Sequence, residues 1–298
     1  MFRLLSKQTH IFSIPAYMLV LLAFISVFNI FNFSVLNIVS SLIAFCGIVL
    51  GYFLFNNIGL NQKSHLPLFI YTLFIFCFYF GNIDLPLAVT LLGTHLVMLV
   101  LTNNNEEIRK NSYFLVGCII GILYVLQPQI WPILLFVLLH IFGTSSRIIP
   151  DLLKIFFGVI LIAINYFGYC FIFNTPDCAW RLIPFISDKL ITKWDPVAYL
   201  APLLVFLLYS MMDHFMNFAK KSPTSKFKYT LLLMYLGSIV TTLVLYMDTD
   251  YEFLLLTALP LAIIISRGIR FMKSPQAREI ALWFLILSTL LFKAAYYF

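Results

Sequence analysis

An uncharged run from Phe253 to Ser266 separates acidic residues from basic ones, and it constrains the fold more than any other feature of the chain. The charged residues that flank it are Asp248, Asp250, Glu252, Arg267, Arg270 and Lys273. Lysine and arginine in short loops stay on the cytoplasmic side of a membrane. The run is therefore predicted to cross a membrane with its acidic end outside and its basic end inside.

Charged residues are too scarce in this chain for a soluble domain. Apolar residues make up 62% of the 298 and charged residues 10%, whereas soluble domains have roughly 45–50% and about 25%. The net charge of +7 fits the excess of cytoplasmic lysine and arginine, so nucleic acid is not an expected partner. We predict a polytopic membrane protein that contacts membrane lipids and forms a single domain over residues 1–298.

Ten further apolar runs bring the predicted transmembrane helices to about 11. They cover residues 11–31, 35–55, 66–81, 85–101, 113–126, 129–142, 155–173, 197–212, 229–247 and 280–298. Several are shorter than the ~20 residues that span a typical bilayer. The short runs come in pairs, which fit either short crossings or membrane-embedded hairpins. The predicted fold is an all-α transmembrane bundle with short paired segments.

The basic residues sort onto alternate connections between these runs, which orients the bundle. Of the 19 lysines and arginines, those left on the outer face are Arg181, Lys189, Lys193 and Lys293. A random division would rarely be so uneven, so we predict an N-in, C-out topology.

The longest predicted outer connection, residues 175–196, alternates apolar and charged residues. Trp180, Trp194 and the apolar residues between them suggest an amphipathic helix at headgroup depth. Such a helix either covers a lipid-linked substrate or is a lid that packs on the bundle. In the first case Arg181 is a candidate for binding phosphate, because an arginine fork matches phosphate geometry.

Most of the acids are predicted to lie outside, so chemistry is expected at that face. Asp248, Asp250 and Glu252 could hold a divalent cation, since hard metals such as Mg²⁺ take carboxylate oxygens. The alternative is a solvated loop that is acidic only because cations are held on the other side. Asp84, in an earlier outer loop, is a further candidate.

Other polar residues and glycines each allow two interpretations. His95 inside an apolar run is either functional or bonded to a neighbouring helix, and Asp213 with His214 lies where water can solvate both. The Gly117 and Gly121 pair permits close helix approach and is a weak indication of dimerisation. Two cysteines near the outer face either pair or stay unlinked, namely Cys170 and Cys178.

The stretch YEFLLLTALPLAIIISRGI, residues 251–269, resembles a late helix of the glycosyltransferase C superfamily. That resemblance implies sugar transfer from a polyprenyl-phosphate donor at the periplasmic face. The superfamily's catalytic acid usually lies in the first outer loop, but FNFS, residues 31–34, has no carboxylate. Asp84 is then the nearest candidate for a general base or metal ligand.

The Pro-broken helix pair followed by SSRIIPDLLKIFFG, residues 145–158, resembles an uncharacterised polytopic inner-membrane family of Bacteroidota. We therefore expect a multi-pass protein of a bacterial inner, or cytoplasmic, membrane that acts on lipid-linked sugars in envelope biogenesis. An alternative is a non-catalytic subunit that binds other envelope membrane proteins in an assembly or export complex. A transporter is a third hypothesis, disfavoured because few polar residues could line a cavity.

Overall fold

The regular structure of the chain is helical. A computed structural model of the protein describes residues 1–7, 12–29, 34–58, 64–79, 81, 83–103, 105–145, 147–174, 181–184, 195–246 and 251–297. Every regular element within these ranges is an α-helix or a short 3₁₀ helix. The predicted all-α class is confirmed for this part of the chain.

A long helix lies over each predicted apolar run. The long helices are α2 (Ser13–Asn29), α3 (Val35–Ile58), α4 (His65–Phe78), α5 (Leu85–Leu101), α7 (Tyr113–Leu126), α8 (Pro132–Thr144), α9 (Ile148–Ile172), α12 (Ala201–Met216), α13 (Pro223–Tyr246), α14 (Leu254–Phe271) and α15 (Pro275–Tyr297). The shorter elements are α1 (Phe2–Leu5), α6 (Glu106–Asn111), α11 (Asp195–Ala198), η1 (Pro128–Ile130) and η2 (Phe218–Lys220).

Among the described residues, five helices are long and apolar enough to cross a membrane, namely α3, α9, α13, α14 and α15. The other long helices are apolar but shorter. Helices of this length and apolar character are compatible with an integral membrane protein. The number of crossings and their direction stay predictions.

Three helices, α9, α13 and α15, begin several residues before the apolar runs that predict them. A Ser-Pro pair starts two of these helices, because the hydroxyls of Ser222 and Ser274 each accept a hydrogen bond from a backbone N–H three residues on, at 3.4 Å. Proline in turn fits the first position of a helix. Asp151, Lys226 and Lys228 therefore lie in helices, where the sequence predicts loops.

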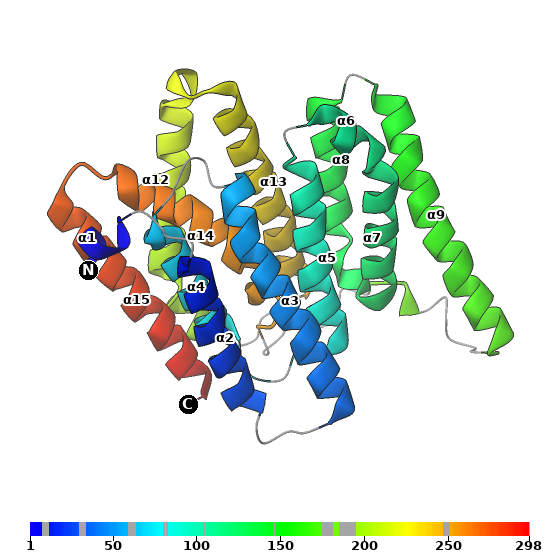
Figure 1. The fold of residues 1–298 in the computed structure, drawn as a ribbon, viewed down its shortest axis with the longest axis horizontal. Helices are drawn as coiled ribbons and strands as arrows, with labels where there is room; N and C mark the ends of the chain where they lie inside the picture. Colours follow the sequence, from blue (N-terminus) through cyan, green and yellow to red (C-terminus); the bar gives the residue numbers. More distant parts are fainter. Residues whose placement is uncertain are drawn as a thin grey trace.

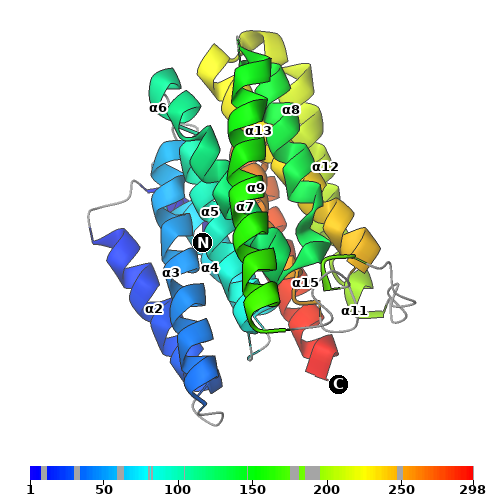
Figure 2. The same cartoon turned by 90° about the vertical axis from the view of Figure 1, so that its right-hand side faces the viewer.

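The helices form a bundle whose connections lie at its two ends (Figure 1). α6, the α8–α9 link and the α12–α13 link share the upper end of Figure 1, which we call the basic end because it carries the lysines and arginines of these connections. Figure 2 shows α2 and α3 on one side of the bundle and α12 on the other. Three connections that are predicted to be cytoplasmic thus lie together.

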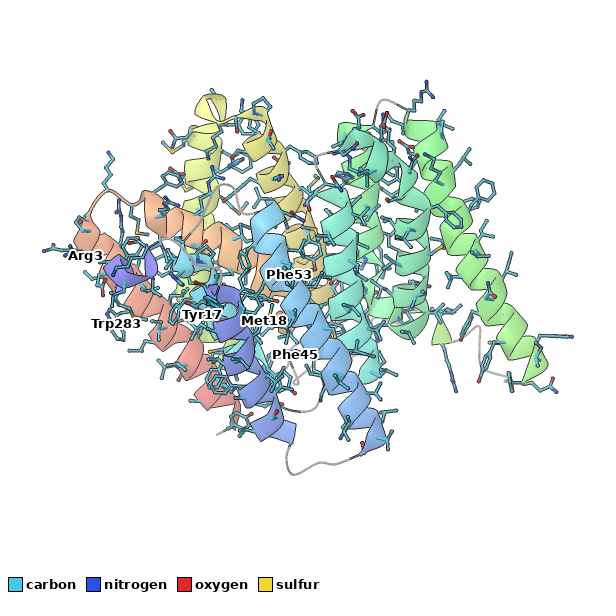
Figure 3. The ribbon with its side chains drawn as sticks, in the orientation of Figure 1. Arg3, Tyr17, Met18, Phe45, Phe53 and Trp283 are labelled. Atoms are coloured by element: carbon cyan, nitrogen blue, oxygen red, sulfur yellow. The ribbon has the colours of Figure 1, made fainter. Side chains whose placement is uncertain are left out.

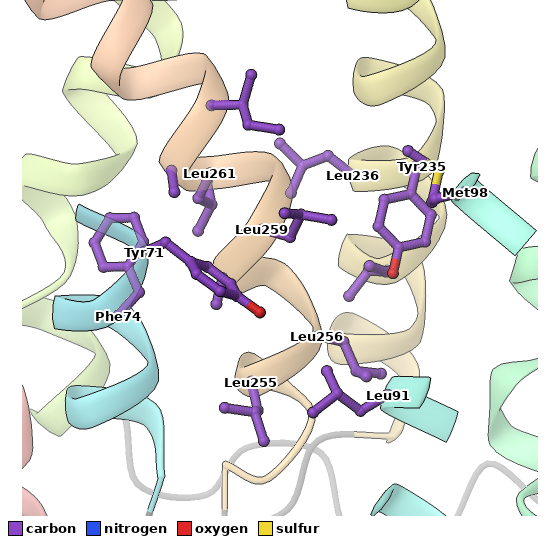
Figure 4. Packing of buried hydrophobic residues seen from close by; sticks show 14 of the residues in the cluster. Tyr71, Phe74, Leu91, Met98, Tyr235, Leu236, Leu255, Leu256, Leu259 and Leu261 are labelled. Atoms are coloured by element: carbon purple, nitrogen blue, oxygen red, sulfur yellow. The ribbon is translucent and has the colours of Figure 1, made fainter. Parts of the chain in front are cut away.

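α14 is the central helix of the bundle, and nearly all of its residues are buried. Figure 4 shows Leu255, Leu256 and Leu259 of α14 between Tyr71 of α4 and Tyr235 of α13. A helix that is apolar on all sides belongs in such a position. The stretch that resembles a glycosyltransferase C helix is therefore the core of the fold.

Glycines bring α7 and α9 close together. A Cβ atom on Gly117 would lie 2.3 Å from the Ile155 carbonyl oxygen, and one on Gly121 would lie 3.0 Å from Ile162 Cβ. The glycine pair therefore packs against a helix of the same chain, which accounts for it without a dimer. α9 stands at the edge of the bundle, where its side chains project outward (Figure 3).

Two buried lysines bind the C-terminal carbonyls of neighbouring helices. Lys228 Nζ of α13 donates to the Asn57 oxygen at the end of α3. Lys293 Nζ of α15 donates to the Phe76 oxygen at 2.5 Å and to the Tyr79 oxygen at 3.3 Å, at the end of α4. These carbonyls lack partners within their own helices and form the negative end of the helix dipole. The sequence assigns both lysines to aqueous loops or faces, which is wrong for side chains this buried.

Two of the open alternatives from the sequence concern His95 and Cys170. His95 is buried, and its Nδ1 lies 2.7 Å from the Gly47 oxygen of α3, so it bonds a neighbouring helix. Cys170, near the end of α9, is disulfide-bonded. Cys178, its predicted partner, lies outside the described residues.

Candidate functional site

The structure describes three of the residues predicted to carry chemistry at the outer face. Asp84 is exposed and precedes α5, and Arg181 is exposed in a short segment. The Leu182 oxygen of that segment accepts a hydrogen bond from Tyr124 of α7 at 2.7 Å. Glu252 lies just before α14 and is partly exposed. The other predicted site residues fall outside the described residues, and these are Trp180, Trp194, Asp248 and Asp250.

These placements do not assemble a catalytic centre from the described residues. Asp84 and Arg181 belong to different elements and make no hydrogen bond or salt bridge with each other. Within the described ranges, no three His, Cys, Asp or Glu side chains are grouped as metal ligands would be. Most of the acidic cluster lies outside those ranges, so a divalent cation at that loop stays a prediction.

A different polar site lies at the basic end, around the first turns of α13. Three consecutive residues there contact three different neighbours, because successive side chains on a helix point about 100° apart. Phe227 faces His140 of α8, with ring centroids 5.7 Å apart. Lys228 binds the end of α3, and Tyr229 faces α12 and α14.

Tyr229 is the centre of a group of residues that we call the Tyr229 cluster: Lys221, Ser225, Tyr229, His214 and Arg267. The imidazole of His214 stacks on the Tyr229 ring, with centroids 3.8 Å apart and planes 12° apart. The Arg267 guanidinium carbon lies 5.3 Å from the centroid of the same ring. Both Arg267 terminal nitrogens lie 3.3 Å from Ser225 Oγ. An aromatic ring thus holds an imidazole and a guanidinium from two other helices.

The cluster contains two buried hydrogen-bond donors that have no partner. Lys221 Nζ lies 3.0 Å from His214 Nδ1. Because an ammonium can only donate, Nδ1 is the acceptor, and a neutral imidazole then carries its proton on Nε2. His214 Nε2 and Arg267 Nε are both buried without a hydrogen-bond partner in the described structure. Since such groups are costly unless paired, both indicate a missing acceptor.

The two cations of the cluster, Lys221 and Arg267, are only partly balanced by the nearby carboxylate of Asp213. Neither Lys221 nor Arg267 forms a salt bridge with any described carboxylate. The nearby Asp213 instead accepts a hydrogen bond from Asn217 at 2.9 Å. Burial, and then the charge of Arg267, lower the pKa of Lys221, and the Asp213 carboxylate opposes them only in part. An oxyanion at this position would offset both effects, since it favours the charged ammonium and accepts from the two free donors.

Two other cations of the basic end are paired with carboxylates. Lys154 Nζ lies 3.2 Å from the buried Asp151, which also accepts a hydrogen bond from Ser145 at 2.6 Å. Lys110 pairs with Glu106 at 2.7 Å. Arg109 of α6 forms no salt bridge with a described carboxylate, and its Nε, like His140 Nδ1 of α8, is buried without a partner in that part of the chain. The Tyr229 cluster differs from them in bringing two cations and two such donors into one group.

The family of the chain follows from a match that covers it completely. Residues 1–298 match a family described as "Family of unknown function (DUF6427)". The chain belongs to the DUF6427 family. No curated protein matches the chain, and no solved structure matches it either. What this DUF6427 protein does must therefore be argued from its own residues.

Sequence reasoning missed the Tyr229 cluster, because it places Asp213 and His214 in water. His214 is in fact only 1% exposed, since Tyr229 stacks on its face while Phe215 and Phe218 contact its ring edge-on. The signal that could have revealed the cluster is the alternation of basic and aromatic residues in KFKY, residues 226–229. In a helix, that alternation places aromatic rings and cations at the same depth.

Proposed function

We propose that this DUF6427 protein binds a phosphate-bearing lipid at the basic end of its bundle. The observation that carries the proposal is the Tyr229 cluster. Two of its donors are buried and unpaired, and its two cations form no salt bridge with a carboxylate of the described residues. A phosphate supplies both the charge and the acceptor atoms that these groups lack. A lipid carries that phosphate to the depth at which the ends of membrane helices lie.

This proposal keeps the lipid-linked substrate class implied by the glycosyltransferase C resemblance and places its phosphate at the end opposite to the predicted outer face. Sugar transfer with Asp84 as base stays a separate prediction. Binding without chemistry also fits a non-catalytic subunit of an envelope assembly or export complex. In either role the lipid phosphate is bound by Lys221, His214 and Arg267.

We further propose that the protein is a multi-pass inner-membrane protein with N-in, C-out topology and that each long helix crosses the bilayer. The basic end then faces the cytoplasm, as expected for its lysines and arginines. The disulfide at Cys170 supports this orientation, because α9 ends away from the basic end and disulfides persist in oxidising compartments.

A pair of serine-to-cysteine substitutions tests the topology. Ser34→Cys lies in a predicted outer connection and Ser222→Cys in a predicted cytoplasmic one, and both serines are exposed residues just before a helix. In a chain whose native cysteines are replaced by alanine, a membrane-impermeant maleimide should label Ser34→Cys in intact spheroplasts. It should label Ser222→Cys only after permeabilisation. Labelling of Ser222→Cys in intact spheroplasts would reverse the orientation.

Replacing Arg267 tests the phosphate site. In detergent, the wild-type protein is expected to bind dioleoyl phosphatidic acid, and Arg267→Gln should bind it at least tenfold more weakly. The reason is that a hydrogen bond to a charged group contributes roughly 1.5–3 kcal/mol, and about 1.4 kcal/mol corresponds to tenfold. Native mass spectrometry with a lipid titration measures both affinities.

Arg270→Gln is the matched control, because Arg270 is an exposed arginine one turn further along α14 and its removal changes the net charge equally. It should bind the lipid like the wild type. Dioleoylglycerol, which has the same chains without phosphate, should not bind, and inorganic phosphate at the lipid's concentration should not compete. Equal loss in both variants would mean a non-specific charge effect and would contradict the proposal.

A further inference from the structure

An apolar groove of about 620 Å³ lies between α12, α13 and α14. Its walls run from Val197 to Leu207 on the α12 side and from Leu236 to Val244 on α13, and α14 forms its floor. Thr257 is the one lining residue that is not aliphatic, and its hydroxyl is bonded to the Leu254 oxygen at 2.6 Å. A volume of this size lies within the ~300–1,000 Å³ of small-molecule sites.

The groove and the Tyr229 cluster are built from the same three helices. On α12 the groove ends at Leu207 and the cluster contributes His214, seven positions later. On α13 the cluster residue Tyr229 precedes the groove residue Leu236 by the same spacing. Seven positions are two helical turns, so both features lie on one face of each helix, roughly 10 Å apart.

α14 contributes to both features from different faces, because Leu261 and Arg267 are six positions apart and their side chains point about 120° away from each other. The groove ends at Leu261, and the cluster contributes Arg267 less than two turns later. The side chains between them, such as Ile264 and Ile265, are buried and apolar. On α12 and α13, the cationic site at the basic end is therefore followed, on the same face of each helix, by the apolar groove toward the opposite end.

We infer that the groove holds the hydrocarbon chain of a lipid whose phosphate occupies the Tyr229 cluster. The inference rests on the proposed function and adds the chemical class of the ligand, a long-chain lipid phosphate. Charge complementarity selects this occupant, because a purely apolar helix or chain would fill the groove and leave the cluster unpaired. From Tyr229 to Val244 the shared face is roughly 20 Å long, about two thirds of the ~30 Å hydrocarbon thickness of a bilayer. A short chain would not reach the groove.

The groove opens to the side of the bundle, where a lipid can enter from the bilayer. Leu204 on α12 and Val240 on α13 line it and are 57% and 42% exposed. Large apolar side chains that are both groove-lining and exposed mark its rim. The chain can therefore enter sideways between α12 and α13 while the phosphate stays at the level of the headgroups.

Filling the groove tests the inference without touching the phosphate site. Val240→Trp should weaken binding of dioleoyl phosphatidic acid at least tenfold and leave binding of the short-chain dihexanoyl phosphatidic acid unchanged. Arg267→Gln should weaken the binding of both lipids. Val39→Trp is the matched control, because Val39 on α3 is 43% exposed and lies outside the groove. It should bind both lipids like the wild type.

The outcomes separate the two proposals. If Val240→Trp binds the dioleoyl lipid normally while Arg267→Gln does not, the chain lies elsewhere and this inference is overturned, whereas the phosphate site stands. If the wild type binds neither lipid, the proposed function itself fails. Leu204→Trp, on the opposite wall, repeats the test, and melting temperatures in detergent show that each variant is folded.

Discussion

Replacing Gly158 by alanine is expected to destabilise the protein, although alanine normally stabilises a helix by about 1 kcal/mol relative to glycine. A Cβ atom at Gly158 would lie 2.4 Å from the Phe114 oxygen and 2.8 Å from the Cys118 nitrogen. Both are backbone atoms of α7, which cannot move aside as the end of a side chain can. Overpacking costs roughly 1–3 kcal/mol and sometimes more, so we expect a net loss of about 2 kcal/mol. Thermal unfolding in detergent measures it.

Gly168→Ala, a substitution in the same helix, is expected not to destabilise the protein. Nothing lies within 4 Å of a Cβ atom at Gly168, so this variant should unfold at the wild-type temperature or slightly above it. The sign of the effect should therefore differ between two chemically identical substitutions in α9. If both variants were equally stable, the close α7–α9 contact through Gly117 and Gly158 would be wrong.

The helices could be predicted from the sequence because apolar run length and charge placement are local properties. The close approach of α7 to another helix can also be predicted from local sequence, since two glycines four residues apart leave a groove on one helix face. The identity of that neighbour is not local. Gly158 lies in a separate run, with no glycine spacing of its own that would mark it, so only the structure shows that α9 supplies the opposite surface.

The candidate site was less predictable, because rules that count loop charges treat all lysines alike. Lys226 and Lys228 both belong to the same basic stretch, yet Lys226 stays at the surface over Phe218 while Lys228 is buried against α3. What decides between them is the start of α13 at Pro223, which turns that stretch into a helix. The burial of His214 has a similar cause, because the ring of Tyr229 in the next helix packs on its imidazole.

Lys293→Met is expected to destabilise the junction of α4 and α15. Lys293 is 8% exposed, and its ammonium donates to two backbone oxygens at the end of α4 while lying 3.9 Å from the Phe76 ring centroid. Methionine is apolar and of similar length, so it retains much of the packing but removes the donors and the charge. An unpaired buried acceptor costs roughly 1–3 kcal/mol, and the lost interaction with the helix dipole adds about 0.3–1 kcal/mol. We expect a total loss of about 3 kcal/mol.

Two measurements distinguish this lysine from an ordinary surface charge. The melting temperature of Lys293→Met should fall, and amide hydrogen exchange should accelerate selectively in the last turn of α4, where Lys293 binds the Phe76 and Tyr79 carbonyls. Lys273→Met is the matched control, because Lys273 is exposed between α14 and α15 and should change neither quantity. An unchanged or higher melting temperature for Lys293→Met would mean that removing a buried charge outweighs the lost helix cap, which would contradict the stabilising role assigned to Lys293.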